Sequence, residues 1–200
     1  MRLLLMIAAT ASFFYVPRAA LSEQIPLEDI SRYLNDLRTA VSRFTQINDD
    51  GSISSGTVYI KRPGRVRFEY DPPETGLVIA GSNTVVIYDA KSNQPAETYP
   101  LRRTPLSVIL ARRVDLAQAD MVIGHEFDGE ATIVIAQDPE NPEYGNIALR
   151  FGAEPIALQG WRINTANGSQ IDVLLNELTQ DVRLENQLFD VGEVRQDIDR

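Results

Sequence analysis

No cysteine occurs among the 200 residues of this chain. Disulfides, thiolate metal sites and cysteine nucleophiles are therefore excluded. The acceptor cysteine of a lipid-modified bacterial protein is excluded for the same reason. Stability has to come from an apolar core, and the length is sufficient for one domain with a core of useful size.

Histidine is almost as scarce as cysteine. His125 is the single histidine, and no cysteine or second histidine is available to complete a transition-metal site with it. The chain also lacks G-x-S-x-G, P-loop and G-x-G-x-x-G sequences, which mark serine hydrolases and nucleotide-binding proteins. The sequence therefore predicts a protein that is not an enzyme and that holds no metal or cofactor.

Basic residues are outnumbered by acidic ones. The chain has 19 Lys and Arg against 28 Asp and Glu, a formal net charge of -9 at pH 7. Binding to nucleic acid or to anionic lipid surfaces through bulk electrostatics requires the opposite sign. The composition thus predicts no nucleic-acid partner, and it favours solubility or steering towards a basic partner.

One long apolar run is present, at the N-terminus. A basic residue precedes the mostly apolar residues 3–16, and small residues follow at Ala20 and Ser22. This layout predicts a secretory signal peptide over residues 1–22, cleaved near Ala20 or Ser22. A retained membrane anchor is the less favoured alternative, because the run is shorter than the roughly 20 residues that span a bilayer. We expect residues 23–200 to form a single exported domain.

The remaining chain changes its hydrophobic period once. Leu27, Ile30, Leu34, Leu37 and Val41 repeat at spacings of three and four, which predicts an amphipathic helix. Beyond this segment the period falls to two, and short stretches rich in β-branched and aromatic residues alternate with turn signals. These stretches are "GTVYIKR", "RVRFEY", "GLVIAG", "TVVIYDA", "AETYPL", "MVIGHEF", "ATIVIAQ", "NIALRFG", "GWRINT" and "QIDVLLNEL".

Several of these strands are apolar on both faces, whereas others alternate cleanly. A curved antiparallel sheet with one wall packed on helices produces this mixture. We therefore predict an α+β protein built as one antiparallel barrel or half-barrel.

A short apolar segment, "TPLSVILARR", interrupts the strands. Thr104 is placed to cap a helix and Pro105 to occupy its first position, with Leu106, Ile109 and Leu110 following. Such a helix either closes an ordinary barrel core or covers a hydrophobic cavity as a lid. The residues alone leave both interpretations open.

Arg62 is anomalous in its strand. If residues 58–62 are extended, Val58, Ile60 and Arg62 share one face, which is otherwise apolar. Burying an unpaired guanidinium costs several kcal/mol. Either Arg62 has a partner on the buried side, or the alternation fails before Pro63 and the side chain points to solvent.

A set of motifs in a fixed order carries a resemblance to a known family. The segments "SRFTQ", "GTVYIKRPGRVRFEYDPPE", "VIAGSNTVVIYDA", "TPLSVILA" and "WRINTANGSQIDVLLNEL", the last followed by "QLFDV", resemble the bacterial outer-membrane lipoprotein carriers of the LolA family. The resemblance implies an unclosed antiparallel β-barrel, with an N-terminal helix and a short helical lid over a hydrophobic cavity. It also implies that Arg62 lies at the cavity rim and hydrogen-bonds to the lid.

The resemblance further implies function, partners and location. A member of this family is a periplasmic chaperone of Gram-negative bacteria that binds the acyl chains of lipoproteins released from the inner membrane and delivers them to the outer membrane. Its expected partners are an inner-membrane lipoprotein-releasing ABC transporter and, where present, an outer-membrane lipoprotein receptor, and the carrier is expected to be a monomer. By analogy, the acyl cavity and lid comprise Val58, Ile60, Arg62, Val66, Phe68, Tyr70, Ile79, Val86, Tyr88, Leu106, Ile109 and Leu110.

Two alternatives remain at this level. The same architecture can serve as a lipid-binding or glycolipid-binding sensor, in which the cavity regulates and does not deliver. A hydrolase with an unrecognised site is disfavoured by the scarcity of nucleophile and base combinations.

Overall fold

The computed structural model describes residues 23–89, 95–118, 120–165 and 167–192. The expected signal peptide, residues 1–22, lies outside the described residues together with its cleavage site. Within the described part of the chain, no helix combines the length and the apolar composition needed to cross a membrane.

The N-terminal helix α1 covers Leu27–Asp36 and is shorter than the repeat of apolar residues suggested. The chain becomes extended at Leu37, with φ -64° and ψ 96°, and strand β1 begins at Thr39 and continues to Ile47. Val41 therefore belongs to a strand, and its assignment to the helix was wrong. Its spacing fits both periods, and pairing with β2 decided between them.

The strands form one antiparallel sheet in the order β6-β5-β4-β3-β2-β1-β11-β10-β9-β8-β7, with the short β12 also paired to β1. The end strands β6 and β7 are not paired with each other, so the barrel is unclosed, as predicted. The strands after β1 are β2 Ile53–Lys61, β3 Arg65–Tyr70, β4 Leu77–Gly81, β5 Thr84–Tyr88, β6 Glu97–Pro100, β7 Val122–Phe127, β8 Thr132–Gln137, β9 Asn146–Ala153, β10 Ile156–Asn164, β11 Gln170–Leu175 and β12 Thr179–Gln180.

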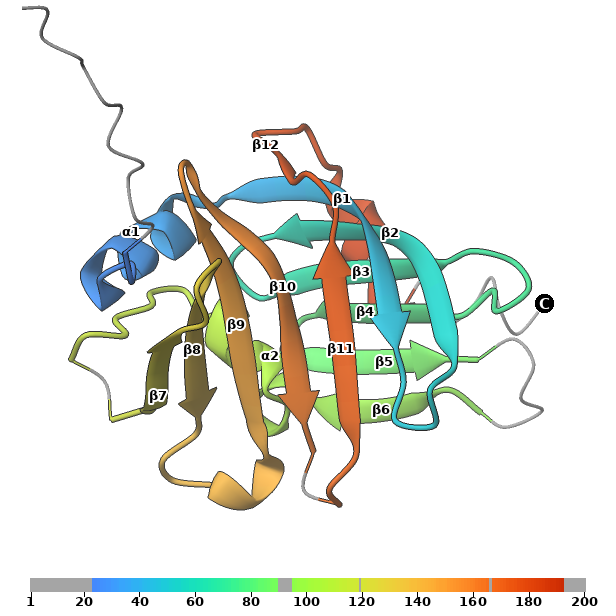
Figure 1. Ribbon diagram of the computed structural model, residues 1–200. Helices are drawn as coiled ribbons and strands as arrows, with labels where there is room; N and C mark the ends of the chain where they lie inside the picture. The colour runs from blue at the N-terminus through green and yellow to red at the C-terminus, as the bar shows by residue number, and fades with distance from the viewer. Residues whose placement is uncertain (1–22, 90–94, 119, 166, 193–200) are drawn as a thin grey trace, which may run out of the picture.

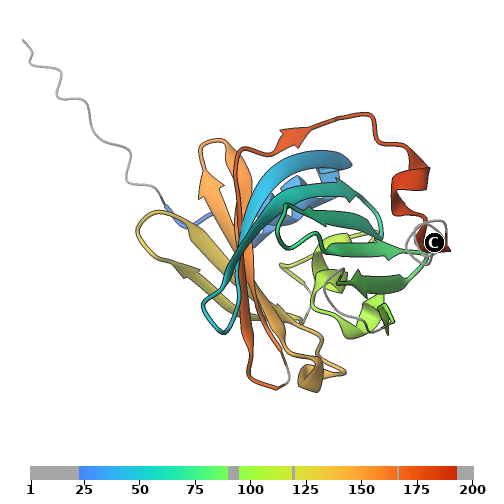
Figure 2. The same cartoon turned by 90° about the vertical axis from the view of Figure 1, so that its right-hand side faces the viewer.

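The helical pieces lie at the ends, in the hollow and on the outer side of this sheet (Figures 1 and 2). Helix α1 lies at one end of the half-barrel, and the five-residue helix α2 lies within its concave side. The 3-10 turns are η1 Leu101–Arg103 directly before α2 Leu106–Leu110, η2 Pro142–Tyr144 between β8 and β9, and η3 Asn186–Phe189 near the C-terminus.

An aromatic cluster packs on the concave side, where the two walls of the sheet meet. Phe44 of β1 meets Phe68 and Tyr70 of β3 edge to face, with ring centroids 5.3 and 5.2 Å apart. Phe68 in turn reaches Trp161 of β10 at 6.1 Å. Each such pair contributes about 0.5–1.5 kcal/mol beyond the area that it buries. The cluster therefore ties together two strands that lie far apart in the sheet order.

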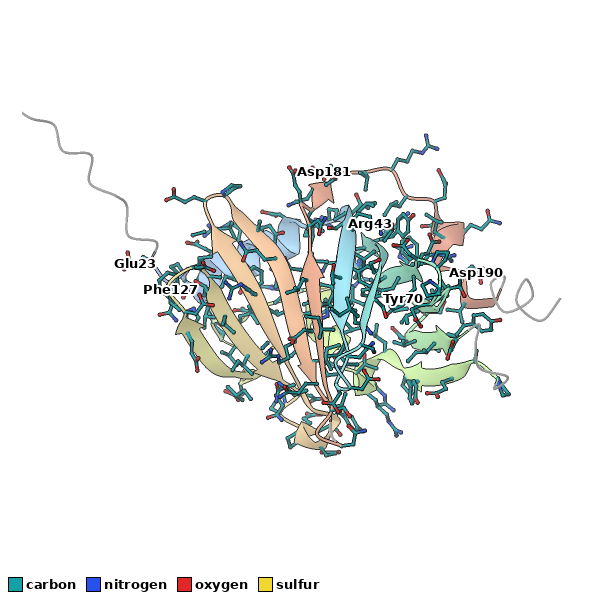
Figure 3. All side chains as sticks on the ribbon, turned by 45° about the vertical axis from the view of Figure 1, so that its right-hand side comes forward. Glu23, Arg43, Tyr70, Phe127, Asp181 and Asp190 are labelled. Atoms are coloured by element: carbon teal, nitrogen blue, oxygen red, sulfur yellow. The ribbon has the colours of Figure 1, made fainter. Side chains whose placement is uncertain are left out.

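The convex side carries several charged pairs and one apolar region. Arg43 pairs with Asp71, and Arg150 with Asp128. Exposed pairs of this kind contribute little to stability. Figure 3 shows side chains on both sides of the curved sheet.

The apolar region of the convex side is covered by the C-terminal segment. Turn η3 contacts β3 and β4, and a Cβ at Gly81 would collide with the carbonyl of Phe189. Ile79 and Phe189 are 2% and 4% exposed, yet neither belongs to the main core cluster. This outer contact explains why β4 is apolar on both faces.

Candidate functional site

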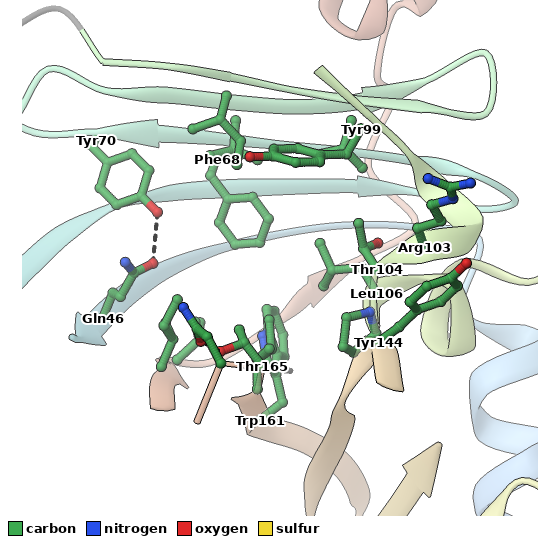
Figure 4. Close-up of a pocket in the computed structure, with 18 of the residues that line it drawn as sticks. Gln46, Phe68, Tyr70, Tyr99, Arg103, Thr104, Leu106, Tyr144, Trp161 and Thr165 are labelled. Carbon is green, nitrogen blue, oxygen red and sulfur yellow. Dashed lines mark hydrogen bonds between the residues drawn. The ribbon is translucent and has the colours of Figure 1, made fainter. Parts of the chain in front are cut away.

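An apolar cavity of ≈ 680 Å³ opens on the concave side of the half-barrel. Its walls come from β3–β5 on one side and from β10 and β11 on the other, and the segment from Arg103 to Leu106 forms one border (Figure 4). The volume lies in the usual range for ligand-binding pockets, roughly 300–1,000 Å³. Apolar and aromatic side chains dominate the lining, which also includes Gln46, Arg103, Thr104, Glu143, Thr165 and Asn167.

Three of the twelve residues assigned to the cavity and lid line it directly: Phe68, Tyr70 and Leu106. Val58, Ile60 and Val66 share the face of Phe68 but lie deeper, with at most 2% of their surface exposed. They belong to the core beneath the cavity. Ile109 and Leu110 are also buried in this core, on the inner side of α2.

Ile79, Val86 and Tyr88 do not line the cavity, so assigning them to it was wrong. The register pairs Phe68 with Val78 and Val78 with Ile87, so Val78 and Ile87 share the concave face with Phe68. Val78, Val85 and Ile87 line the cavity instead. The opposite faces of β4 and β5 are also apolar, and in β4 that face lies under the C-terminal segment. Alternation alone could therefore not separate the two faces.

The second wall was missed altogether. It is formed by Trp161 and Ile163 of β10 together with Ile171 and Val173 of β11. A signal for it was present in the sequence, since Arg162 and Asp172 alternate with these residues and form an ion pair on the other face. A strand pair with one charged and one apolar face must turn the apolar face inward.

Arg62 is buried, with 8% of its surface exposed, and it contacts the end of α2, the helix expected to serve as the lid and called the lid below. Its Nη2 donates a hydrogen bond to the carbonyl oxygen of Ala111, 2.7 Å away, and Ala111 is the residue at which α2 ends. The backbone N–H of Gly64 donates to the carbonyl of Leu110 at 2.8 Å. Carbonyls at the C-terminus of a helix lack hydrogen-bond donors within the helix. The turn after β2 supplies a donor for two of them.

The guanidinium of Arg62 is held there at a cost. Burial lowers its pKa, and the nearby positive charge of Arg38 lowers it further. Its Nε is buried without a hydrogen-bond partner among the described residues. Removal of the guanidinium would therefore relieve desolvation while taking a hydrogen bond from the lid.

The start of the lid differs from the expectation. Thr104 does not cap α2: its hydroxyl donates to the carbonyl of Leu101 at 2.8 Å, within the turn η1 that precedes the helix. Pro105 occupies the N-cap position. With its N-terminus uncapped by a side chain and only five residues in length, α2 depends on packing and on its C-terminal contacts.

The segment after the lid is tied to α1. The side-chain amide of Asn35 both donates to the carbonyl of Val114 and accepts from its N–H, at 2.8 and 2.9 Å. The hydroxyl of Ser31 accepts from the N–H of Leu116 at 2.9 Å. The lid is thus fixed at its C-terminal side and at the residues that follow.

A polar pair lies at the opposite end of the cavity from Arg103 (Figure 4). The hydroxyl of Tyr70 donates to Oε1 of Gln46 at 2.7 Å. Burial raises the pKa of Tyr70 to about 12, and the hydrogen bond to Gln46 offsets only part of that effect. Tyr70 therefore stays neutral at every pH at which the protein is expected to work.

The raised pKa of Tyr70 predicts a loss of stability in alkali. Because the folded pKa is about 12 against a usual value of 10.0, the stabilisation is complete below pH 10 and is lost as the pH rises towards 12. The slope expected from this one group is about 1.4 kcal/mol per pH unit. Urea unfolding measured across this range should show a shallower decline for Tyr70→Phe than for the unmodified protein. Identical slopes would mean that Tyr70 is solvated.

His125 lies away from the cavity. Its Nε2 is 2.9 Å from the carbonyl oxygen of Ile25, at the entrance to α1. Among the described residues, no group of three or more histidine, aspartate or glutamate side chains could hold a metal ion. This contact gives His125 a structural partner.

The fold and the site together define a class of protein, an open antiparallel half-barrel with an apolar cavity bordered by a short helix. The sequence profile described as outer membrane lipoprotein carrier protein LolA matches residues 35–192. The chain therefore belongs to the LolA family.

Individual relatives agree with this assignment. An outer-membrane lipoprotein carrier protein of Legionella pneumophila (strain Paris) is 28% identical over 177 residues, covering 83% of this chain and 85% of the relative. A carrier protein of Coxiella burnetii (strain RSA 331 / Henzerling II) is 33% identical over 97 residues, covering 44% of this chain. That match spans 46% of the length of the Coxiella protein, less than half.

The fold has a counterpart among solved structures. A domain from Vibrio parahaemolyticus, described as a putative outer membrane lipoprotein-sorting protein, superimposes with a TM-score of 0.50 at 8% identity. The match covers 84% of this chain and 97% of that domain. At this identity the likeness concerns the fold alone.

Proposed function

We propose that the protein is a periplasmic lipoprotein carrier, which binds the acyl chains of lipoproteins released from the inner membrane and delivers them to the outer membrane. The observation that carries this proposal is the apolar cavity bordered by the start of α2 in a chain of the LolA family. The inner-membrane releasing transporter and an outer-membrane receptor are its proposed partners, and a monomer is its proposed state.

The energetics of the cargo require such a cavity. Each methylene transferred from water to an apolar site gains about 0.8 kcal/mol, so two 16-carbon chains exposed to water represent a penalty on the order of 25 kcal/mol. An acylated protein therefore needs an escort between membranes. An empty cavity must also be shielded, because large exposed apolar patches cause aggregation.

The size of the cavity limits what the described conformation can hold. A methylene takes up about as much space as a water molecule, whose share is about 30 Å³, so a 16-carbon chain fills on the order of 500 Å³. The cavity of ≈ 680 Å³ accommodates one such chain. For a cargo whose chains need more room than this, α2 would have to move away from the concave face, and the contacts of Arg62 and Gly64 with its C-terminal end are the ones that would break.

The test is identification of the cargo. Protein purified from periplasm should carry lipoproteins or their acyl chains, detected by native mass spectrometry and lipid extraction. Purified protein should also transfer a labelled lipoprotein from donor to acceptor membranes. Recovery of a free glycolipid in place of lipoprotein, with no transfer, would contradict the proposal and favour a sensor of the same fold.

A further inference from the structure

A second depression, of ≈ 760 Å³, borders the lid. It lies among the β2–β3 turn, the β4–β5 turn and the segment from Pro100 to Arg112, and it shares no lining residue with the acyl cavity. The lid segment contributes to both: Arg103 and Leu106 line the cavity, whereas Arg102 and Ser107 line the second depression. We call this depression the arginine groove.

The arginine groove is basic in an acidic protein. Arg65, Arg102 and Arg112 line it, and no aspartate or glutamate does so among the described residues, although the chain has a net charge of -9. Arg102 and Arg112 are exposed, and within the described part of the chain neither forms an ion pair. Arg65 donates one hydrogen bond, to Oδ1 of Asn186 at 2.9 Å, which leaves most of its N–H groups available.

Three guanidinium groups around one concave site are suited to carboxylates. Arginine presents a planar fork of donors that matches a carboxylate in two hydrogen bonds. We propose that the arginine groove binds an acidic segment of a protein partner that docks against the lid. Only the effect of docking on acyl binding rests on the proposed carrier function. Binding of the acidic segment itself can be tested without cargo.

A protein segment fits the groove better than a membrane surface does. The site is recessed between two turns and the lid, so a flat layer of headgroups would meet its rims before its floor. An extended anionic surface would also be repelled by the net negative charge of the chain. A short acidic segment brings only a few charges and can enter the recess.

Docking at this site would act on the lid. Leu110 and Ala111, whose carbonyls are held by Gly64 and Arg62, both line the groove. A segment seated there contacts the C-terminal end of α2, which is the anchored end. The segment could bind more tightly when α2 is closed or when α2 has moved away from the concave face. A difference between these two affinities would couple partner binding to acyl binding, and the coupling would be reciprocal.

The experiment measures binding of a fluorescent oligoglutamate peptide, with the matching oligoglutamine peptide as the neutral probe. The unmodified protein should bind oligoglutamate alone, and its affinity should fall as salt is added. The double variant Arg102→Ala with Arg112→Ala should bind about tenfold more weakly, the size expected for two exposed ion pairs. The matched control is Arg32→Ala with Arg183→Ala, which removes two exposed arginines elsewhere and should bind normally.

The outcomes separate this inference from the carrier function. Loading of an acyl probe should be the same in both double variants, because none of these four residues lines the cavity. Equal weakening of oligoglutamate binding in both variants would overturn the proposal, since bulk charge would then explain it. Arginine-dependent binding to phosphatidylglycerol vesicles without binding to the peptide would also overturn it, in favour of a headgroup site. Failure of the unmodified protein to bind the acyl probe would contradict the carrier function. It would not affect the conclusion drawn from peptide binding.

Discussion

Arg62→Leu should take up lipoprotein from donor membranes and hand it over poorly to acceptor membranes. The substitution removes the hydrogen bond from Nη2 to the carbonyl of Ala111, so the closed, empty state loses a contact that a charged donor makes. It also makes the rim more apolar, which favours the loaded state. We expect these two effects to outweigh the relieved desolvation of Arg62 and so to raise the affinity for the cargo. About 1.4 kcal/mol of tightening slows release about tenfold at an unchanged rate of uptake.

Loading and handover have to be measured as separate steps. Arg62→Lys should be impaired only in part, because an ammonium keeps the charge and loses the planar fork. Arg183→Leu is the matched control, since the side chain of Arg183 is 91% exposed and far from the lid in sequence. Thermal unfolding should show that Arg62→Leu is folded, as expected when a desolvated charge is replaced by an apolar group. Normal handover by folded Arg62→Leu would mean that the contact with the lid has no role in release.

Ile171→Glu should abolish acyl binding while Leu174→Glu leaves it intact. Both residues belong to β11, but Ile171 lines the cavity, whereas Leu174 is 47% exposed on the convex face. A carboxylate facing a bound acyl chain is either buried at a cost of several kcal/mol or keeps water in the cavity, so affinity should fall by about a hundredfold or more.

The measurement is displacement of a fluorescent fatty acid from the cavity. Ile171 is only half-buried, so the variant is expected to fold, and circular dichroism of both variants checks this. Equal affinity in the two variants would place the acyl site outside the cavity. Both substitutions are in the same strand, add one negative charge and remove apolar surface. They therefore differ mainly in the face of the sheet on which the new carboxylate lies.

The sequence by itself determined most of the elements, β1 and the short β12 being the strands that it did not indicate. The change from a period of three or four to a period of two gave one N-terminal helix and a run of strands, and each of the ten stretches read as extended contains a strand. Local chemistry sets such elements, because alternation and turn residues act over a few positions. The absence of cysteine and the single histidine restricted the chemistry in the same direct way.

The contact made by Arg62 was only partly within reach of the sequence. Alternation placed Arg62 on the apolar face, which required a partner or a failure of the pattern. The partner is a carbonyl at the end of a helix 49 positions away. Only the folded structure shows that this partner is the carbonyl of Ala111, because every residue has a backbone carbonyl and the sequence does not mark one of them.

The choice of cavity face was decided by tertiary structure alone. In β4 and β5 both faces are apolar, and a period of two does not say which one turns inward. Pairing with β3 put Val78 inward with Phe68, and the C-terminal segment around Phe189 covers the outward face at Gly81. The segment that hides Ile79 from water lies about a hundred residues further along the chain, beyond the range over which neighbouring residues can specify structure.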